Sequence, residues 1–364
     1  MNNKITALIP TFQRPQFLQR AIRSVLNQTH QNLQVSVFDN ASNDGTREMV
    51  QAMQQQDGRI FYHCHKANMG ALKNFKYAFG TINTPYFSIL SDDDALIDDF
   101  YENAIQILEK HEDIMFVIFN TLLIDENSNL IGNRTSTNSL TIFRNDERFN
   151  ATSIANLPST WTSMLFRKEV ATIYTKMQDQ FDIAADMKFL MLARTKYHFA
   201  YYSKVGAFFT YHSNTASTQR PYFDLMHHAV QISRYIEIYY DSSISQLAKE
   251  QAYLTVKNML SPSIKNNFDA CSTSIKQAIK KICNHPNLEK KVIDDEITCA
   301  KRAGFNITAF ILNQIYKNKI VNYFVRMFFS RYYEKHKAHH AVKMTVLQNT
   351  AYKKMFEKLK ALTA

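Results

Sequence analysis

The sequence predicts an α/β fold, with a mostly parallel sheet and flanking helices in residues 1–220 and an α-helical module in residues 221–364. Strand-like and helix-like segments alternate through the first 120 residues, which is typical of a parallel sheet with right-handed crossovers. From about Pro221 onward the strand signals stop and helical spacing dominates. The chain has 364 residues, 45% of them apolar, and can therefore bury the cores of two such domains.

The predicted elements of the first domain follow in order along the chain. Residues 5–9 are apolar and predict a strand, and residues 17–27 carry apolar side chains at helical spacing. A second strand is expected at residues 33–38, and Thr46 is expected to cap the helix after the turn signal at 43–45. We expect further strands at 60–64, 86–90, 115–119, 199–202 and 207–211, helices at 72–79, 99–108 and 182–193, and irregular chain at 122–165.

Three consecutive carboxylates, Asp92, Asp93 and Asp94, follow the apolar run at residues 86–90. Adjacent like charges repel one another, and a divalent cation would relieve that repulsion. Mg²⁺ and Mn²⁺ prefer carboxylate oxygens and often complete their shell with substrate phosphates. The cluster therefore predicts a metal-diphosphate site, and its alternative is a solvated acidic turn that caps a helix beginning near Asp98.

Polar residues also follow two other predicted strands. Pro10 and Thr11 come after the first strand, and Asp39 comes after the second. In α/β sheets the ligand lies beyond the carboxyl ends of the strands. We therefore expect these residues and the acidic cluster to surround one crevice.

The net charge of +11 is unevenly distributed. Residues 1–220 contain 21 basic and 21 acidic side chains, whereas residues 221–364 contain 22 basic and 11 acidic ones. This excess indicates a module that faces a polyanion. The four cysteines form no C-x-x-C pair, and neither a signal-peptide core nor an uncharged membrane span is visible. We therefore expect a cytoplasmic protein from a reducing compartment.

Taken together, the motifs resemble the inverting family 2 glycosyltransferases of GT-A fold. The matching segments are residues 9–15, 24–29, 39–46 and 90–94, together with Asn68-Met69-Gly70 and Asn74. The resemblance is strong over residues 4–110 and weaker to about residue 215. Residues 221–364 match no family pattern that we know.

The resemblance implies roles in binding a nucleoside-diphosphate sugar. Asp39 would accept a hydrogen bond from the base, with uracil N3–H the expected donor, because a carboxylate only accepts. The alternative is that Asp39 only begins a turn. Pro10 and Thr11 would shape the base pocket, and Arg14 would either approach the diphosphate or lie exposed at a helix start. Asn68, Gly70 and Asn74 would form the loop beside the nucleotide, where Gly70 also permits a tight turn.

For the metal, the resemblance implies a D-x-D motif. Asp92 would lie near the ribose and the metal shell, Asp93 would belong to the donor site, and Asp94 would bind Mn²⁺ or Mg²⁺ directly. The metal would stabilise the departing nucleoside diphosphate. His212 weakly matches a histidine that some relatives place near the metal, and its alternative is a surface residue.

An inverting transfer needs a general base that takes a proton from the acceptor hydroxyl. Asp186 matches the base position best, although Ala185 stands where many relatives have an acidic residue. Asp182, which would otherwise lie in the acceptor site, is the second candidate. The alternative is that both carboxylates only favour a helix N-terminus through the macrodipole. Trp161, the single tryptophan, is expected either to stack on an acceptor sugar or to pack in the core.

The C-terminal module is predicted to contain helices at residues 226–240, 245–259, 274–283 and 307–333. Aromatic and basic residues are interleaved between Tyr323 and Lys337. Such a basic amphipathic segment indicates either an anionic membrane surface or a helical bundle that packs on another subunit. No nucleic-acid recognition motif is present, so no nucleic-acid partner is expected.

The sequence therefore predicts a bacterial, metal-dependent glycosyltransferase that is cytoplasmic or peripheral on the inner face of the cell membrane. It would transfer a sugar from a nucleoside-diphosphate sugar, with UDP the expected nucleotide, to a glycan or lipid-linked acceptor. By family analogy the product belongs to a surface polysaccharide such as a lipopolysaccharide chain or a capsule. The alternatives are a nucleotidyltransferase and a non-catalytic, membrane-associated nucleotide-sugar-binding module.

Overall fold

The computed structural model describes residues 3–133, 138–144, 160–177, 185–211, 357–359 and 361–362. All of these residues belong to one compact unit. The predicted C-terminal helices, the predicted boundary at residue 220, Asp182 and His212 lie outside the described residues. They stay predictions.

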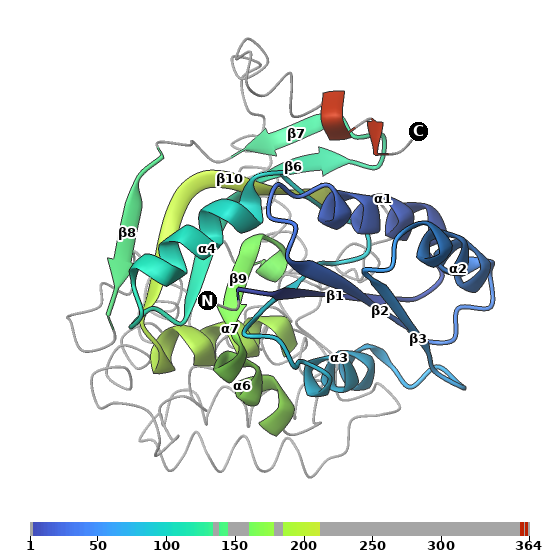
Figure 1. Cartoon of the computed structure of the whole chain (residues 1–364), viewed down its shortest axis with the longest axis horizontal. Helices are drawn as coiled ribbons and strands as arrows, with labels where there is room; N and C mark the ends of the chain where they lie inside the picture. The colour runs from blue at the N-terminus through green and yellow to red at the C-terminus, as the bar shows by residue number, and fades with distance from the viewer. Residues whose placement is uncertain are drawn as a thin grey trace, which may run out of the picture. The chain divides into compact units, whose positions relative to one another are not determined.

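A ten-stranded sheet with the strand order β3-β2-β1-β4-β9-β6-β10-β5 forms the centre of this unit, and β7 and β8 pair with β6 and β10 (Figure 1). The strands are β1 (Ile5–Thr11), β2 (Leu33–Asp39), β3 (Ile60–Cys64), β4 (Tyr86–Ile89), β5 (Ala95–Leu96), β6 (Phe116–Asp125), β7 (Leu130–Asn133), β8 (Leu140–Phe143), β9 (Met164–Arg167) and β10 (Phe199–Tyr211). Strands β3, β2, β1 and β4 are parallel, and β9 lies antiparallel between β4 and β6. The predicted α/β sheet is confirmed, and the insertion of β9 makes it mixed.

Helices cover both faces of the sheet. They are α1 (Pro15–Leu26), α2 (Thr46–Gln56), α3 (Ala71–Gly80), α4 (Phe100–Lys110), α6 (Ala171–Lys176) and α7 (Ala185–Lys196), with 3-10 turns η1 (Trp161–Ser163) and η2 (Lys168–Val170). Apolar residues of α1, α2 and α4 share one core cluster with β1 and β2. On the opposite face, aromatic rings of α3, α6 and α7 pack together: Phe79 stacks on Tyr174, and Phe189 meets both rings in T-shaped contacts.

The structure differs from the sequence-based expectation in three places. Residues 122–165 contain the end of β6 and the strands β7, β8 and β9, where irregular chain was predicted. One strand, β10, replaces the two predicted near residues 199–211, because register shifts between Tyr202 and Ala207 let it bend without ending. Gly45, in the left-handed region with φ of 86°, caps α2 in place of Thr46.

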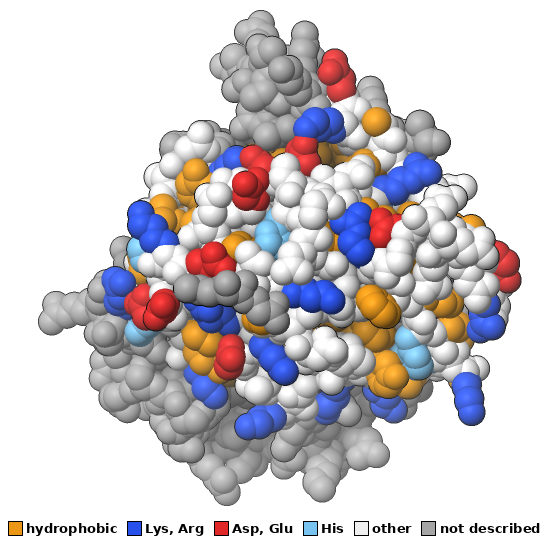
Figure 2. Space-filling view, viewed as in Figure 1, with side chains coloured by type: hydrophobic (Ala, Val, Ile, Leu, Met, Phe, Trp, Pro, Cys, Tyr) orange, Lys and Arg blue, Asp and Glu red, His pale blue; other side chains and the backbone are white. Residues whose placement is uncertain are grey.

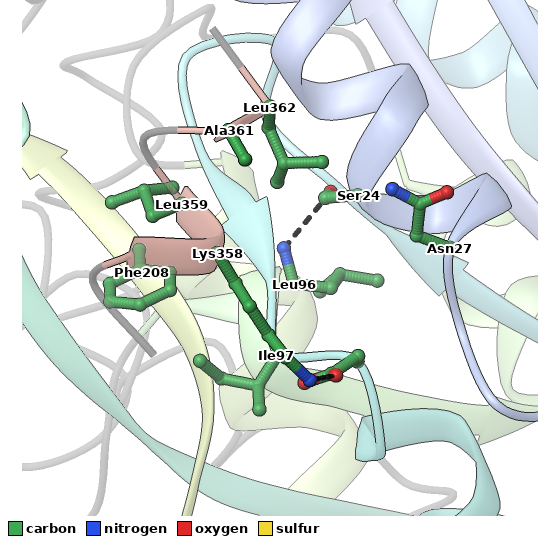
Figure 3. A pocket seen from close by; sticks show the side chains of 10 residues that line it. Ser24, Asn27, Leu96, Ile97, Phe208, Lys358, Leu359, Ala361 and Leu362 are labelled. Carbon is green, nitrogen blue, oxygen red and sulfur yellow. Dashed lines mark hydrogen bonds and ion pairs between the residues drawn. The ribbon is translucent and has the colours of Figure 1, made fainter. Parts of the chain in front are cut away.

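Residues 357–359 and 361–362 belong to the same unit and pack beside β5 and β10. Leu359 is 1% exposed and lies in an apolar cluster with Ile97 and Phe208. Lys358 forms an ion pair with Asp98. Figure 3 shows the resulting pocket of about 250 Å³ between this segment and β5. The segment therefore supports the strand that follows directly after Asp92 to Asp94.

The face drawn in Figure 2 shows basic and acidic side chains interspersed among uncharged ones over the described residues. This distribution agrees with the equal numbers of basic and acidic residues in the first 220 positions. Within the described ranges, none of the helices combines the length and the apolar character needed to cross a bilayer.

Candidate functional site

The carboxyl ends of β1, β2 and β4 bring several predicted site residues together. Thr11 and Asp39 are register partners at the ends of β1 and β2. The Thr11 hydroxyl donates a hydrogen bond of 2.8 Å to Asp92 Oδ2, which connects the end of β1 to the loop after β4. Parallel pairing of β1 with both neighbours thus gathers residues that are about 80 positions apart into one site.

The three carboxylates of this loop are buried, with exposures of 6% for Asp92, 9% for Asp93 and 0% for Asp94. Asp94 accepts hydrogen bonds from the Thr162 hydroxyl at 2.5 Å and from the backbone N–H of Thr210 at 2.8 Å. Strand β5 separates the loop from α4, whose N-cap is Asp99. The acidic cluster is therefore not the solvated, helix-capping turn that was its alternative.

Two arginines partly compensate this negative charge. Arg14 Nη1 donates to Asp92 Oδ1 at 3.2 Å and to Asp93 Oδ2 at 2.9 Å. Arg20, which is 1% exposed on the inner face of α1, donates to the Asp93 carbonyl at 2.5 Å and to the Thr210 hydroxyl at 2.8 Å. Arg14 is also the N-cap of α1 and is partly buried, and its approach to a diphosphate stays a prediction.

Burial and repulsion still disfavour the charged forms of Asp92 and Asp94. Burial, and then the charge of Asp93, raise the pKa of Asp92 to about 6. The same two causes raise the pKa of Asp94 well above its usual value. A buried acidic cluster in which Asp92 and Asp94 resist ionisation is suited to binding a cation, because a cation removes the repulsion.

The donor set of this loop fits a hard divalent cation. Its ligands are carboxylate oxygens, which Mg²⁺ and Mn²⁺ prefer. Among the residues that the structure describes, no three His, Cys, Asp or Glu side chains converge as a complete metal cage. Mg²⁺ usually binds through only one or two carboxylates and takes its other ligands from water and substrate phosphates. The loop is thus able to hold a metal together with a diphosphate.

Asp39 is 1% exposed at the end of β2 and is held by its neighbours. Its Oδ1 accepts from the backbone and the hydroxyl of Ser42, and its Oδ2 accepts from the Tyr62 hydroxyl at 2.6 Å. Gln13, whose φ is 57°, donates its backbone N–H to Ser42 Oγ at 2.8 Å. The loops after β1 and β2 are therefore joined around this carboxylate.

Hydrogen bonds of asparagine side chains hold the loop before α3 in place. Asn68 Oδ1 accepts from Asn40 Nδ2 at 2.8 Å and from the backbone N–H of Gly70 at 2.9 Å. Gly70 has a φ of 86°, a conformation that favours glycine. Asn74 is buried and donates to the Phe38 carbonyl at 2.9 Å, while its Oδ1 lies 3.0 Å from His65 Nε2. Asn68 and Asn74 thus fix this loop against the end of β2.

The predicted acceptor-side residues lie on other elements. Asp186 is partly buried in the first turn of α7. Trp161 is 6% exposed, and its ring centroid lies 4.9 Å from that of Phe75 and 6.3 Å from that of Phe189. This packing matches the core alternative for Trp161, while its contact with an acceptor stays a prediction.

Sequence analysis missed four residues that organise the site: Arg20, Tyr62, Thr162 and Thr210. Arg20 had a signal, because it is a charged residue three positions after Phe17 on the apolar face of a predicted helix. The other three donate to Asp39 or Asp94 across long sequence separations. No local pattern in the sequence marks such contacts.

The sheet and its acidic loop belong to one α/β domain. Residues 6–173 match the family model "Glycosyl transferase family 2". This stretch, just under half of the chain, is therefore similar to family 2 glycosyltransferases, and the sheet has a GT-A-like arrangement.

Two curated relatives illustrate the similarity. A GalNAc(5)-diNAcBac-PP-undecaprenol beta-1,3-glucosyltransferase of Campylobacter jejuni is 29% identical over 35% of this chain and 40% of the relative. The abequosyltransferase RfbV of Salmonella typhimurium is 33% identical over 30% of this chain and 34% of the relative. The chain thus spans well under half of the length of the curated relatives that it matches.

Among solved structures, TarS 1–349 of S. aureus in complex with UDP-GlcNAc has a TM-score of 0.58. The two chains are 16% identical, and the match covers 88% of this chain and 95% of TarS 1–349. At this identity the similarity establishes the fold alone.

Proposed function

We propose that this chain is a metal-dependent, inverting glycosyltransferase that transfers a sugar from a nucleoside-diphosphate sugar to a hydroxyl group. The observation that carries the proposal is the buried acidic loop at the end of β4, held by Thr11 and Arg14 beside the end of β2. Burial raises the pKa of both Asp92 and Asp94, so their charged forms are poorly stabilised without a partner. A cation bound to a diphosphate would supply the positive charge that stabilises them.

Each candidate residue has a role in this proposal. Asp94 and Asp92 would hold Mn²⁺ or Mg²⁺, and the bound metal would act as a Lewis acid toward the diphosphate leaving group. Asp39 would accept a hydrogen bond from the base, and Arg14 would exchange part of its contact with the carboxylates for the diphosphate. Asp186 would take the proton from the acceptor hydroxyl.

For the acceptor, we propose a lipid-linked glycan of the cell surface. Support comes from the similarity to the Campylobacter jejuni enzyme, whose name specifies an undecaprenol-linked acceptor, and to an abequosyltransferase. The acceptor would be met at the inner face of the membrane. The basic residues of positions 221–364 suit such a location.

The first prediction tests the metal assignment with Asp94→Asn. This change keeps the shape of a fully buried side chain, whereas alanine would leave the donors of Thr162 and Thr210 without a partner. We expect sugar release from UDP-, dTDP- or GDP-sugars to depend on Mn²⁺ or Mg²⁺ in the wild type and to be nearly abolished in the variant. Hydrolysis and transfer assays with added metal or with EDTA measure both effects.

The matched control is Asp113→Asn, an exposed aspartate paired with Arg144. It should leave turnover unchanged. Near-normal transfer by Asp94→Asn in EDTA would contradict the metal assignment. Nucleotide transfer to a phosphate acceptor would favour the nucleotidyltransferase, and binding without any turnover would favour the non-catalytic module.

A further inference from the structure

A buried arginine of α1 connects three segments around the acidic loop. Arg20 is 1% exposed, and its Nη2 donates to the Asp93 carbonyl at 2.5 Å and to the Thr210 hydroxyl at 2.8 Å. Its Nη1 donates to the Ser128 hydroxyl at 3.3 Å, in the turn between β6 and β7. One guanidinium therefore joins α1 to the loop after β4, to the end of β10 and to this turn.

The contact with Asp93 fixes the main chain next to Asp94. The Asp93 carbonyl and the Asp94 N–H belong to the same peptide group. The carbonyl accepts from Arg20, and the N–H donates to the Ser91 carbonyl at 3.0 Å. Because a peptide group is planar, holding it on both sides limits the directions in which the Asp94 side chain can leave the backbone.

The contact with Thr210 fixes a group that holds the Asp94 carboxylate. The Thr210 hydroxyl accepts from Arg20, while its backbone N–H donates to Asp94 Oδ1 at 2.8 Å. The Thr162 hydroxyl holds the other oxygen, Oδ2, at 2.5 Å. Arg20 thus acts on the backbone of Asp94 through Asp93 and on its carboxylate through Thr210.

This position is costly for an arginine. Within the described part of the chain, the buried Nε of Arg20 has no hydrogen-bond partner, and a buried donor without a partner lowers stability. A positive charge near the acidic loop also repels a second cation. The charge alone would therefore make Arg20 unfavourable at a metal site, so we look for its contribution in the geometry of its donors.

We propose that Arg20 is a positioning residue for the metal, whose forked donors hold the Asp93–Asp94 peptide and Thr210 so that the Asp94 carboxylate is oriented toward a divalent cation. The inference rests on the proposed function, in which Asp94 binds Mn²⁺ or Mg²⁺. Groups that orient a metal ligand typically contribute roughly 10–100-fold to metal affinity. Lysine would keep the charge, but its compact ammonium group cannot reproduce the planar fork.

The test measures the dissociation constant of Mn²⁺ by calorimetry for the full chain, with and without UDP. Arg20→Lys should bind Mn²⁺ roughly 10–100-fold more weakly than the wild type, although the charge is unchanged. Excess Mn²⁺ should restore donor hydrolysis by this variant toward the wild-type rate, because every carboxylate ligand remains.

A second variant keeps the test usable if Arg20→Lys does not fold. Thr210→Val removes the hydroxyl that accepts from Arg20 and keeps the backbone N–H that donates to Asp94. It should weaken Mn²⁺ binding several-fold. The double variant should bind Mn²⁺ about as weakly as Arg20→Lys alone, because both changes interrupt the same contact.

Arg23→Lys is the matched control. Arg23 lies on the same helix and donates to the Leu362 carbonyl at 3.1 Å, so the change also alters an arginine–carbonyl hydrogen bond. Its affinity for Mn²⁺ should equal that of the wild type.

An Arg20→Lys variant with a lower Tm in EDTA and wild-type affinity for Mn²⁺ would overturn the inference, because that pattern indicates a purely structural arginine. So would fully additive losses in the double variant. If the wild type binds neither Mn²⁺ nor Mg²⁺ even with UDP, the metal assignment of the proposed function is itself wrong, and the two failures are thus distinguished.

Discussion

At the scale of the single residue, Asp186 offers a direct test of the proposed general base. It is a partly buried carboxylate in the first turn of α7. Asp186→Asn keeps the shape of the side chain and removes the proton acceptor. General-base catalysis contributes roughly 10²–10⁴-fold, so turnover should fall by that factor. Donor affinity, measured by titration with the nucleotide sugar, should be unchanged. An equal loss of donor affinity would indicate a structural role, and an unaffected turnover would favour Asp182.

The pKa of Asp92 predicts how the stability of the metal-free protein depends on pH. Burial and Asp93 raise this pKa from 3.8 to about 6, so the folded protein binds more protons than the unfolded chain between those values. The free energy of unfolding should therefore decrease as pH rises from about 4 to about 6, by roughly 2 kcal/mol from this group.

Asp92→Asn provides the comparison for this pH dependence. Tm is measured in EDTA for both proteins. Between pH 4.5 and pH 7, the Tm of the variant should rise relative to the Tm of the wild type. Parallel Tm profiles for the two proteins would show that Asp92 titrates normally.

At this scale the sequence predicted which carboxylates lie at the carboxyl ends of the strands, but not the side chains that hold them in place. Asp39, Asp92 and Asp94 could be predicted because a motif with fixed spacing surrounds them. The donors to Asp94, from Thr162 and Thr210, come from η1 and β10, 68 and 116 positions away. Hydrophobic periodicity carries no information about such long-range pairs.

At the scale of the element, Gly206 allows β10 to pack closely on α4 and β6. It lies at a register shift between Val205 and Ala207, and its carbonyl accepts from the backbone N–H of Ile97 at 2.9 Å. A Cβ at this position would lie 2.8 Å from atoms of Phe100 and Phe119. The close packing of α4, β6 and β10 therefore requires glycine here.

Gly206→Ala should lower the free energy of unfolding by about 1–3 kcal/mol, because an extra methyl group overpacks the core. Urea denaturation measures this change. Gly58→Ala, where a Cβ would meet nothing within 4 Å, is the control and should have almost no effect. An unchanged midpoint for Gly206→Ala would mean that β10 moves to accept the methyl group.

The sequence predicted the parallel half of the sheet well and the antiparallel half poorly. In the first half each strand is apolar and is followed by an amphipathic helix, so the periodicity changes at each boundary. Strand β9 has only four residues, and it pairs with β4 and β6, which lie far away in sequence. β7 and β8 are equally short, so nothing local separates them from loops.

At the scale of the whole molecule, the charge excess of residues 221–364 predicts salt-sensitive binding to anionic membranes. Each basic residue near the bilayer contributes about 1 kcal/mol, and the attraction fades within a Debye length. We expect co-sedimentation with anionic liposomes at low salt and its loss on charge reversal, while hydrolysis of the donor is unchanged. The reversed residues are Arg326, Arg331, Lys335 and Lys337, each changed to Glu.

The control reverses four exposed lysines of the first domain and should leave liposome binding intact; these are Lys66, Lys73, Lys110 and Lys168. A wild-type protein that stays in the supernatant at low salt would exclude the membrane interpretation. Dissociation of an oligomer by the reversals, seen by light scattering, would identify the module as an assembly surface.

The packing of residues 357–359 and 361–362 has a practical consequence for the design of shorter fragments of this chain. A fragment that ends at residue 220 keeps every strand of the sheet but lacks Leu359, and it would expose Ile97 and Phe208 to water. It would also lose the bond from Arg23 to the Leu362 carbonyl at 3.1 Å. Because exposed apolar surface promotes association, such a fragment is expected to aggregate. A short linker that rejoins these few residues to it would be the better design.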